Sequence, residues 1–422
     1  MAPVRLGLLR AAWPVVTAAL HRVTQRPLIV ITTHSADAWQ MAEQLHYWLD
    51  DAGVVQRYPE PDVLAYERMP WAIETRQQRV SALAALMSVH REEGLPPIIV
   101  TSIRAVLRKT LPPREFLLGV RSLRVDQAIN LNNLLAYWYA FGYEPVEVVE
   151  EPGQYSRRGG IIDVFSPQWR RPVRIELFGD NIDSLRTFDP KTQRSTERLE
   201  AVTLLPAREA LPKFGPAARK RFAALDFSTC QVAARNEFAR DMESLEQSEV
   251  FQNLEFYIPY LYSQTTTLLD YLPGDSLLVL DDLTQIKARV RELSEQVDAM
   301  RAAMHSAGEL PSGTLPPHAA WEDVQDILER PDTLFLGYGG FEAPHPLGEV
   351  FGVSPRYGAQ LRDLLGEWLE RSNTGRREVV VSRQASRLAD LLTENGMSTR
   401  PVQRIDTPPP PDSITLVQGA LP

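Results

Sequence analysis

The sequence has 422 residues, of which 44% are hydrophobic and 23% are charged. These values are typical of folded soluble proteins and exclude the disordered, collagen-like and disulfide-scaffold classes, while the length predicts about three compact units. The formal net charge of -9 gives no support for nucleic-acid binding from bulk charge, so any basic site has to be local.

The first hundred or so residues predict a parallel α/β unit. Two apolar, β-branched runs, Pro27–Ile31 and Pro97–Thr101, are typical of strands buried on both faces. Apolar residues at helical spacing follow the first run, with Ser35 at the position of the helix N-cap, and a further helix is predicted over Ile73–Val89. Strands that alternate with helices in this way indicate a parallel sheet.

From about Val146 to Leu205 the chain shows short alternating runs separated by turn residues, which predict an antiparallel β-rich module. The predicted strands are Val146–Val149, Gly160–Phe165, Val173–Phe178, Ile182–Phe188 and Val202–Leu205.

Helical periodicity returns from about Ala217, and a predicted strand at Leu277–Leu280 precedes a long helix at Leu283–Met304, so we expect the α/β domain to resume. A linker is predicted over Pro311–Pro317. The rest predicts a second small α/β domain with a stiff connector, from the segments Thr333–Leu336, Ala359–Leu369, Val379–Val381, Ala385–Glu394, Pro408–Pro411 and Ile414–Val417. Because the last strand ends five residues before the terminus, we expect the chain to be a piece of a longer protein.

The single cysteine, Cys230, excludes an internal disulfide and fits a reducing cytosol. The seven histidines never recur at the spacing of a helical metal-binding pair, and no run reaches the roughly 18 apolar residues that span a bilayer. The apolar run Leu6–Leu20 is similar to a signal peptide, but Arg10 and Pro14 interrupt it, which favours an amphipathic first helix. We therefore predict no metal, no membrane contact and a cytoplasmic location.

The phosphate-binding loop of nucleotide-binding α/β domains is missing from the sequence. That loop needs a lysine directly after a glycine, and none of the five lysines follows one: Lys109, Lys191, Lys213, Lys220 and Lys287. The segment before the first predicted helix, Gly7–Trp13, also lacks the lysine and the second glycine. Asp281 and Asp282 are similar to a magnesium-holding pair, but without the loop we favour solvated acids that face a helix start. We predict no catalytic residue and no cofactor.

The most informative stretch runs from Glu150 to Phe165 and reads EEPGQYSRRGGIIDVF. Together with Pro172–Arg186 and Thr192–Ser195, it closely resembles the UvrB-homology module of the bacterial transcription-repair coupling factors. Supporting matches are Tyr58–Pro61, Tyr66–Arg68, Leu204–Glu209 and Leu277–Asp281. The resemblance covers essentially the whole chain and thins beyond about residue 310.

The resemblance implies an α/β fold with a UvrB-like, degenerate RecA-type domain. Residues 1–112 would form its first part, 113–205 the inserted UvrA-binding module, 206–310 its second part, and 311–422 a linker and a truncated small α/β domain. Members of this family displace RNA polymerase stalled at a lesion with an ATP-driven translocase and recruit UvrA for nucleotide excision repair. This chain would be the non-catalytic, UvrA-recruiting N-terminal part. RNA polymerase, DNA, ATP and magnesium would bind elsewhere in full-length members, where a C-terminal domain would mask the UvrA site.

The predicted UvrA-binding residues are Arg158, Arg174, Phe178 and Arg157. Alternation along the predicted strand places Arg174 and Phe178 on one polar face, and arginine beside an exposed aromatic is typical of an interface. The glycines after Arg158 permit a turn that aims its side chain outward. By resemblance, Arg158, Arg174 and Phe178 match the positions that contact UvrA. The alternative from the residues alone is an edge-covering phenylalanine beside a solvated arginine.

The arginines near this face are expected to form a local basic patch, opposed across the stretch only by Asp163: Arg157, Arg158, Arg170, Arg171 and Arg174. Two other functions stay open on these residues. One is a UvrB-like DNA-binding or damage-recognition protein with ATPase activity, against which the missing phosphate loop and the short segment Tyr58–Ile73, in place of a long DNA-clamping hairpin, both count. The other is direct DNA binding through the patch.

Overall fold

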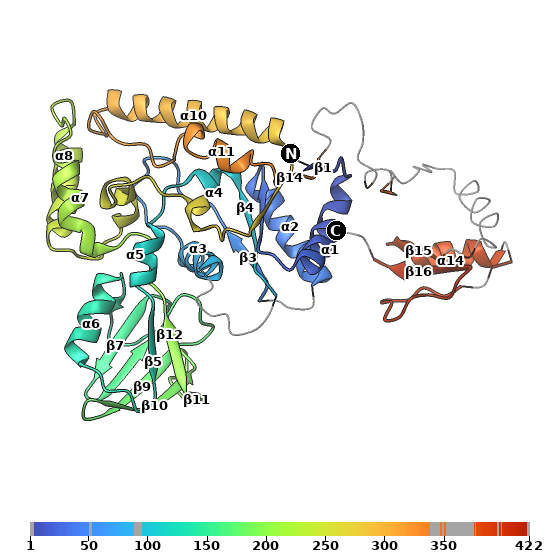
Figure 1. The fold of residues 1–422 in the computed structure, drawn as a ribbon, viewed down its shortest axis with the longest axis horizontal. Helices are drawn as coiled ribbons and strands as arrows, with labels where there is room; N and C mark the ends of the chain where they lie inside the picture. The colour runs from blue at the N-terminus through green and yellow to red at the C-terminus, as the bar shows by residue number, and fades with distance from the viewer. Residues whose placement is uncertain are drawn as a thin grey trace. The chain divides into compact units, whose positions relative to one another are not determined.

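The computed structural model describes residues 4–49, 53–87, 95–337, 347, 350–351, 375, 377–394, 396–397 and 399–419. The chain divides into two compact units, Met1–Gly352 and Val353–Pro422. Figure 1 shows the first unit as a sheet flanked by helices together with a β-rich module, and the second as a small strand–helix–strand unit.

A parallel sheet of six strands lies at the centre of the described part of the first unit, which confirms the predicted parallel sheet. The strand order is β1 (Val4–Arg5), β14 (Leu334–Phe335), β13 (Leu277–Leu280), β2 (Leu28–Thr32), β4 (Ile98–Ser102) and β3 (Val55–Tyr58). Strands β2, β4 and β13 are buried at every residue, because helices cover both faces of the sheet.

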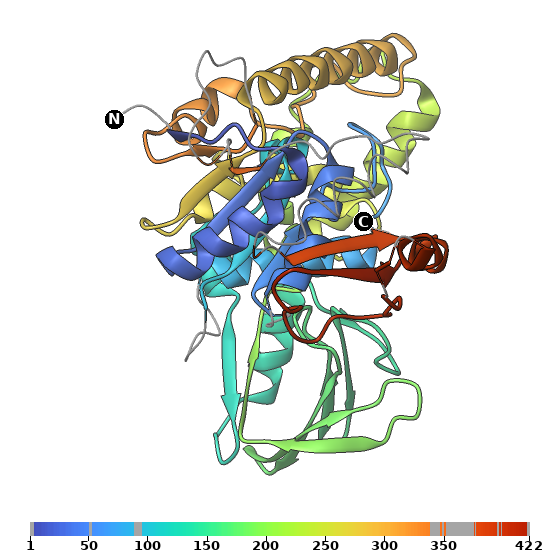
Figure 2. The same cartoon turned by 90° about the vertical axis from the view of Figure 1, so that its right-hand side faces the viewer.

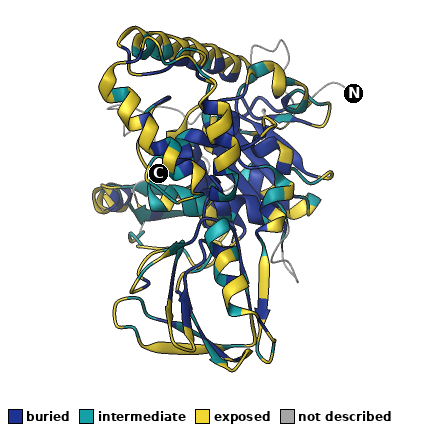
Figure 3. Cartoon of the chain, turned by 90° about the vertical axis from the view of Figure 1, so that its left-hand side faces the viewer, coloured by how far each residue is buried: buried dark blue, intermediate teal, exposed yellow. Residues whose placement is uncertain are grey.

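Two separate cores form on the two faces of this sheet. Leu28 and Val30 share a core with α1 (Trp13–Thr24) and α2 (Ser35–Trp48). Ile29 and Ile31 alternate to the other face, where the core includes side chains of the helices α3 (Ile73–Leu86), α4 (Ile103–Leu107) and α10 (Leu283–Ser306). Figure 3 shows the sheet strands as buried and the outer sides of the helices as exposed.

The N-terminal segment starts its helix later than predicted. Leu6 and Leu8 are buried in extended chain beside β14, where their amides donate to the carbonyls of Phe335 (2.8 Å) and Leu336 (2.7 Å). The short 3-10 helix η1 (Arg10–Ala12) then leads into α1, which holds Pro14 in its first turn. Proline fits only there, since inside a helix its ring clashes with the preceding turn.

The prediction of Ser35 as a helix N-cap is wrong. Ser35 is the first residue of α2, and His34 holds the N-cap position without a side-chain hydrogen bond. The neighbouring Thr33 donates hydrogen bonds from its amide and its hydroxyl to the Asp281 carboxylate. Asp281 follows β13, the strand that pairs with β2.

The β-rich module follows α5 (Pro113–Leu118) and is built on a second sheet, shown in Figure 2 below the parallel sheet. Among the described residues its strand order is β11 (Ser195–Leu199), β10 (Asn181–Phe188), β9 (Val173–Phe178), β8 (Ile161–Val164), β7 (Gln154–Arg158) and β6 (Glu144–Pro145). Neighbours are antiparallel except β6 and β7, which confirms the antiparallel character. The pair β5 (Arg121–Arg124) and β12 (Ala201–Leu204) and the helix α6 (Leu131–Ala140) complete the module.

Several strands of the module, among them β5, differ from the prediction. Val146–Val149 is not a strand, because the chain pairs with β7 two residues earlier, at β6. β7 (QYSRR) and β11 (STERL) were not predicted, since both are mostly polar. They gain their backbone hydrogen bonds from neighbouring strands, a source that apolar alternation does not reveal.

A buried ion pair fixes the module to the parallel sheet. Arg79 of α3 is fully buried, and its Nε donates to Glu209 Oε2 at 2.8 Å, while Glu209 lies in the segment that returns from the module. Thr110 Oγ1 donates to the same carboxylate at 2.8 Å, and the Tyr58 hydroxyl at 3.3 Å. The Arg79 guanidinium also lies over the Tyr58 ring, 4.0 Å from its centroid. Residues from both sides of the junction therefore share one satisfied polar network.

Short helices then lead to β13 and, past α10, on to β14. They are α7 (Gly215–Phe222), α8 (Val232–Glu246), α9 (Ile258–Leu261) and α11 (Gln325–Leu328), with the 3-10 helices η2 (Pro212–Phe214), η3 (Leu254–Tyr257), η4 (Leu268–Tyr271) and η5 (Trp321–Asp323). The predicted long helix is confirmed as α10, which extends two residues further, to Ser306.

The assignment of Thr333–Leu336 to the second domain is wrong. Leu334 and Phe335 form β14, which pairs in parallel with β13 and with the N-terminal strand β1 inside the first unit. The first compact unit extends to Gly352. β14 lies between β1 and β13, which are both distant from it in sequence. No local pattern near residue 334 indicates this pairing.

In the second unit, β15 (Arg377–Ser382) and β16 (Ser413–Gln418) pair in parallel, with α14 (Ala385–Glu394) between them in sequence. Ala385, Ala389, Leu392 and Leu416 form its small core. These elements confirm the strands predicted around Val380 and Leu416 and the helix Ala385–Glu394. The helix predicted over Ala359–Leu369 lies outside the described residues.

Candidate protein-binding face

The strands β7 to β11 have an inner face on the module core and an outer face. Ile162, Val164, Val173 and Ile175 point inward, where they join a core with Trp138 of α6. Side chains alternate along each strand, and directly opposed residues of two strands share a face. The register therefore identifies the residues whose side chains point away from this core. We call this the outer face, and its members are Ser156, Arg158, Ile161, Asp163, Arg174, Glu176, Phe178, Ser184, Arg186, Phe188 and Arg198.

Phe178 is the most exposed aromatic side chain of this face, at 81% of its possible surface. It is the last residue of β9, and Gly179 after it has a φ of +60°, a conformation that glycine adopts without strain. Its cross-strand partner is Asn181 on β10. A large apolar group held at a strand end and left in solvent is available to a partner.

Arg174 is held within the sheet. Its Nε and Nη2 atoms donate to the two Asp163 carboxylate oxygens, each at 2.8 Å, and Nη1 donates to the Gln193 carbonyl at 3.3 Å. The guanidinium carbon lies 4.8 Å from the centroid of the buried Phe188 ring. The hydrogen bonds with Asp163 raise the pKa of Arg174. Only 18% of the side chain is exposed, so Arg174 mainly contacts groups within the module and offers little surface to a partner.

Arg158 and Arg157 lie on opposite sides of the β7–β8 hairpin. Arg158 is exposed on the outer face, and its Nη2 donates to the Glu147 carbonyl at 2.7 Å, while Gly159 with φ +62° begins the turn. Arg157 pairs with the inward-pointing Ile162, so it belongs to the other face, although it is also exposed. The structure therefore brings Arg158, Arg174 and Phe178 together and separates Arg157 from them.

The expectation that Asp163 alone opposes the arginines is wrong, because a second carboxylate lies on the outer face. Asp163 is committed to Arg174, which it pairs with in bidentate geometry. Glu176 also lies on the outer face, where its carboxylate accepts a hydrogen bond from Ser184 Oγ at 2.6 Å. The free positive charge of this face therefore comes from other arginines.

Sequence reasoning missed three residues of the outer face. Ile161 is 39% exposed and stands between Arg158 and Glu176 in the register. Arg186 lies on β10 opposite Arg174, and simple alternation from Ile182 would have placed it on the inner face, because the register of β10 shifts between Ile182 and Ser184. Arg198 lies on β11, which was not predicted, and no local signal assigned it to a face.

The carboxyl ends of β2 and β13 form the crevice where an open α/β sheet would hold a nucleotide. Asp281 is buried there and accepts hydrogen bonds from Thr33 N (2.7 Å), Thr33 Oγ1 (3.0 Å) and Asp282 N (2.6 Å). Burial raises the pKa of Asp281. Asp282 caps α10 by accepting from the amides of Thr284 and Gln285. Both carboxylates are therefore used within the protein. Asp282 lies at a helix start as expected, but the expectation that both acids are solvated is wrong for Asp281, which is buried against the turn that follows β2.

The expected position of a phosphate loop requires a correction. Gly7–Trp13 leads from the edge strand β1 into α1, whereas the turn that faces the crevice is the one between β2 and α2, at Thr33–His34. This turn contains neither glycine nor lysine. The carboxylate of Asp281 lies against its backbone, where an anionic phosphate would need free amides.

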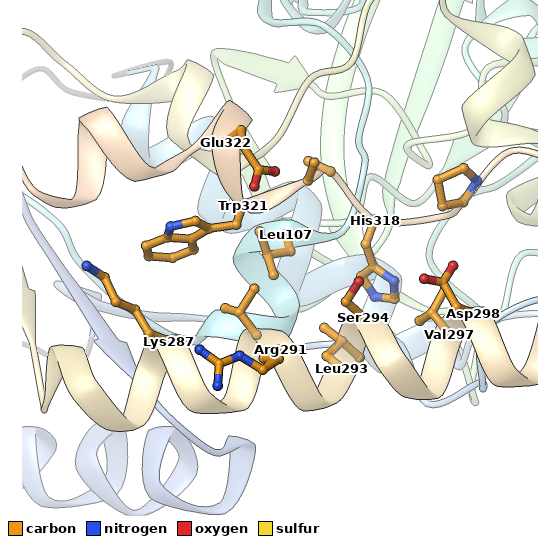
Figure 4. Close-up of a pocket in the computed structure, with 14 residues that line it drawn as sticks. Leu107, Lys287, Arg291, Leu293, Ser294, Val297, Asp298, His318, Trp321 and Glu322 are labelled. Carbon is orange, nitrogen blue, oxygen red and sulfur yellow. The ribbon is translucent and has the colours of Figure 1, made fainter.

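A groove of about 450 Å³ runs along α10 and is shown in Figure 4. Its floor is apolar, with Leu107, Val290 and Leu293, and Trp321 lies opposite the helix. Burial, with the nearby Arg108 and Arg104, lowers the pKa of His318 well below its ordinary value. His318 is therefore a neutral group at the groove and not a ready proton donor.

Within the described residues, no group of three or more His, Cys, Asp or Glu side chains could hold a metal ion. The helices of that part of the chain also include none that is long and apolar enough to cross a membrane.

Comparison with known proteins identifies the module. Residues 122–209, which include the outer face, match the family model of the UvrB interaction domain. The transcription-repair-coupling factor of Bacillus subtilis (strain 168) is 32% identical over 307 residues, covering 70% of this chain and 25% of that protein. That of Myxococcus xanthus is 28% identical over 455 residues, covering 98% of this chain and 36% of that protein.

The chain thus spans about a quarter to a third of the length of the curated relatives it matches. The match with the Myxococcus protein covers almost the whole chain, including the parallel sheet and the module. On these matches, the chain belongs to the family of the transcription-repair-coupling factors and carries a UvrB interaction domain.

Proposed function

We propose that this chain is the non-catalytic, UvrA-recruiting N-terminal part of a transcription-repair-coupling factor. In this proposal the outer face of the module binds UvrA during transcription-coupled nucleotide excision repair in the cytoplasm. RNA polymerase and DNA are engaged by parts of the longer relatives that lie outside this chain. The parallel sheet, in two segments around the module, acts as a degenerate UvrB-like, RecA-type scaffold.

The observation that carries the proposal is Phe178, which stands 81% exposed on the outer face of the matched UvrB interaction domain. Arg158 lies on the same face and is exposed. The ion pair of Arg174 with Asp163 links the neighbouring strands β9 and β8 on this face. An aromatic anchor beside arginine is the composition that dominates binding energy in protein interfaces. Arg158 and Phe178 are the proposed contact residues, and Arg174 is the proposed positioning residue.

The proposed lack of catalysis is supported by the crevice at the ends of β2 and β13. Its anion position is taken by Asp281, and its turn lacks the lysine that reaches nucleotide phosphates. ATP and magnesium would therefore act only outside this chain.

The test is a titration of UvrA with the purified chain and with Phe178→Ala. Truncation of a central aromatic anchor costs about 2 kcal/mol, which corresponds to roughly a thirtyfold loss of affinity. Tyr47→Ala is the matched control, because Tyr47 on α2 is an aromatic residue that is 83% exposed and lies outside the module. Wild-type affinity for Phe178→Ala, or an equal loss for Tyr47→Ala, would refute the assigned face.

A further inference from the structure

We propose that a row of three arginines across the outer face, Arg174, Arg186 and Arg198, binds a carboxylate-bearing surface of a partner protein. The proposal deepens the function above and rests on it for the identity of the partner, UvrA. It assigns binding roles to Arg186 and Arg198, and it gives Arg174 the role of fixing the row.

The register of the sheet places the three residues side by side on consecutive strands. Arg174 of β9 is directly opposed to Arg186 of β10, and Arg186 is directly opposed to Arg198 of β11. Asp163 of β8 stands opposite Arg174 at the other end of the row. Directly opposed residues have Cβ atoms about 4.5–5.5 Å apart, so the row carries three guanidinium groups in a short line.

The charge of this row is only partly balanced. Asp163 takes both donors that Arg174 directs at it. Arg186 and Arg198 have no hydrogen-bond or ion-pair partner anywhere in the part of the chain that the structure describes, and Arg186 Nε is shielded from water without an acceptor. Like charges directly opposed on a sheet repel, and a shielded donor without a partner costs free energy. An incoming anion would offset the repulsion between the opposed guanidinium groups.

The surroundings of the row favour a protein over a nucleic acid. Phe178 and Ile161, which are 81% and 39% exposed, lie on the same face and offer apolar contacts that a phosphate backbone would not use. Carboxylates suit the row because guanidinium groups bind them through paired, planar hydrogen bonds.

The experiment compares the chain with the double variant Arg186→Gln, Arg198→Gln. Its matched control is Arg235→Gln, Arg240→Gln, which removes two exposed arginines of α8 and changes the net charge equally. Each protein is checked for an unchanged melting curve and titrated with UvrA at two salt concentrations. We expect about a tenfold loss of affinity for the row variant and a smaller salt dependence, with no change for the control.

Two further probes separate this inference from the proposed function: poly-L-glutamate and a short DNA duplex, each titrated at low salt. If UvrA binds the chain and both variants equally, the inference is overturned while the proposed function stands. If UvrA binds none of them, the proposed function fails, and a loss of poly-L-glutamate binding in the row variant alone still supports a carboxylate-binding row. Loss of duplex binding without loss of poly-L-glutamate binding overturns the inference in favour of nucleic acid.

Discussion

The carboxyl edge of the parallel sheet and the outer face of the module differ in whether their charged side chains have partners within the protein. At the carboxyl edge, Asp281 is 4% exposed and its carboxylate is used by Thr33 and by the amide of Asp282. On the outer face, Arg186 and Arg198 lack partners among the described residues and Phe178 is 81% exposed. At the edge where α/β sheets usually bind a ligand, the polar groups are therefore paired within the protein, and the proposed binding residues lie on the module.

The difference shows how a fold can keep an architecture without its chemistry. The parallel sheet has β2 and β13 as neighbours, and at their carboxyl ends the Asp281 carboxylate accepts a hydrogen bond from the Thr33 amide. The module and the sheet meet at the buried ion pair of Arg79 with Glu209. The proposed function therefore lies on the module and not at the carboxyl edge of the parallel sheet.

The largest effect is expected for Glu209→Ala, which tests whether the scaffold holds the module. Removing the carboxylate leaves the fully buried Arg79 without its partner, and breaking such a pair costs about 3–5 kcal/mol of unfolding free energy. Denaturant unfolding measures the loss. Glu237→Ala is the control, since that carboxylate pairs with Arg68 but its side chain is 52% exposed, and it should cost at most about 1 kcal/mol. Equal losses would show that burial does not distinguish the two pairs.

The next effect concerns how open the outer face is in the longer protein. In the resembled family a C-terminal domain would cover the UvrA-binding face, so affinity would be reduced by the fraction of open molecules. For an open fraction of about 1%, this chain should bind UvrA about a hundredfold more tightly than a full-length relative, or by about 2.7 kcal/mol. A paired titration at one salt concentration measures the ratio. Equal affinities would show that the face is not masked.

A smaller effect is expected on acidification, from His318 in the closed scaffold. Its folded pKa is lowered well below the ordinary 6.5, first by burial and then by Arg108, Arg104 and Lys109. The unfolded chain therefore binds a proton that the folded chain does not, and the stability present above pH 6.5 is lost as the pH falls below it. We therefore expect the protein to be less stable at pH 5 than at pH 7.

His318→Gln removes the titrating group and should lack this part of the pH dependence. Unfolding free energies of both proteins at pH 7 and pH 5 provide the comparison. Parallel changes in the two proteins would mean that His318 is protonated in the folded state.

The sequence predicted the strands that are apolar and missed those that are polar. The strands Leu277–Leu280 and Val173–Phe178 were predicted correctly. Burial of both faces gives the first a continuous apolar run, and burial of one face gives the second an alternation of apolar and polar residues. Arg198 could not be placed, since its strand, STERL, gains its structure from pairing with β10. Likewise, nothing in the order of residues states that Arg174 meets Asp163, which is eleven positions away, because only the register of β8 and β9 sets that pair.

The smallest expected effect is that of ATP. We expect the melting temperature to stay unchanged when Mg-ATP is added, because a ligand stabilises only the state it binds and the crevice offers no free amides or lysine to a phosphate. Asp281→Ala sharpens this expectation. It should cost about 1–3 kcal/mol of stability, since Thr33 and Asp282 lose their buried acceptor. It removes the carboxylate from the anion position but adds no lysine, so the nucleotide titration should stay flat. ATP binding by Asp281→Ala alone would show that this carboxylate is what closes the crevice, whereas binding by the unaltered chain would contradict the proposed lack of catalysis.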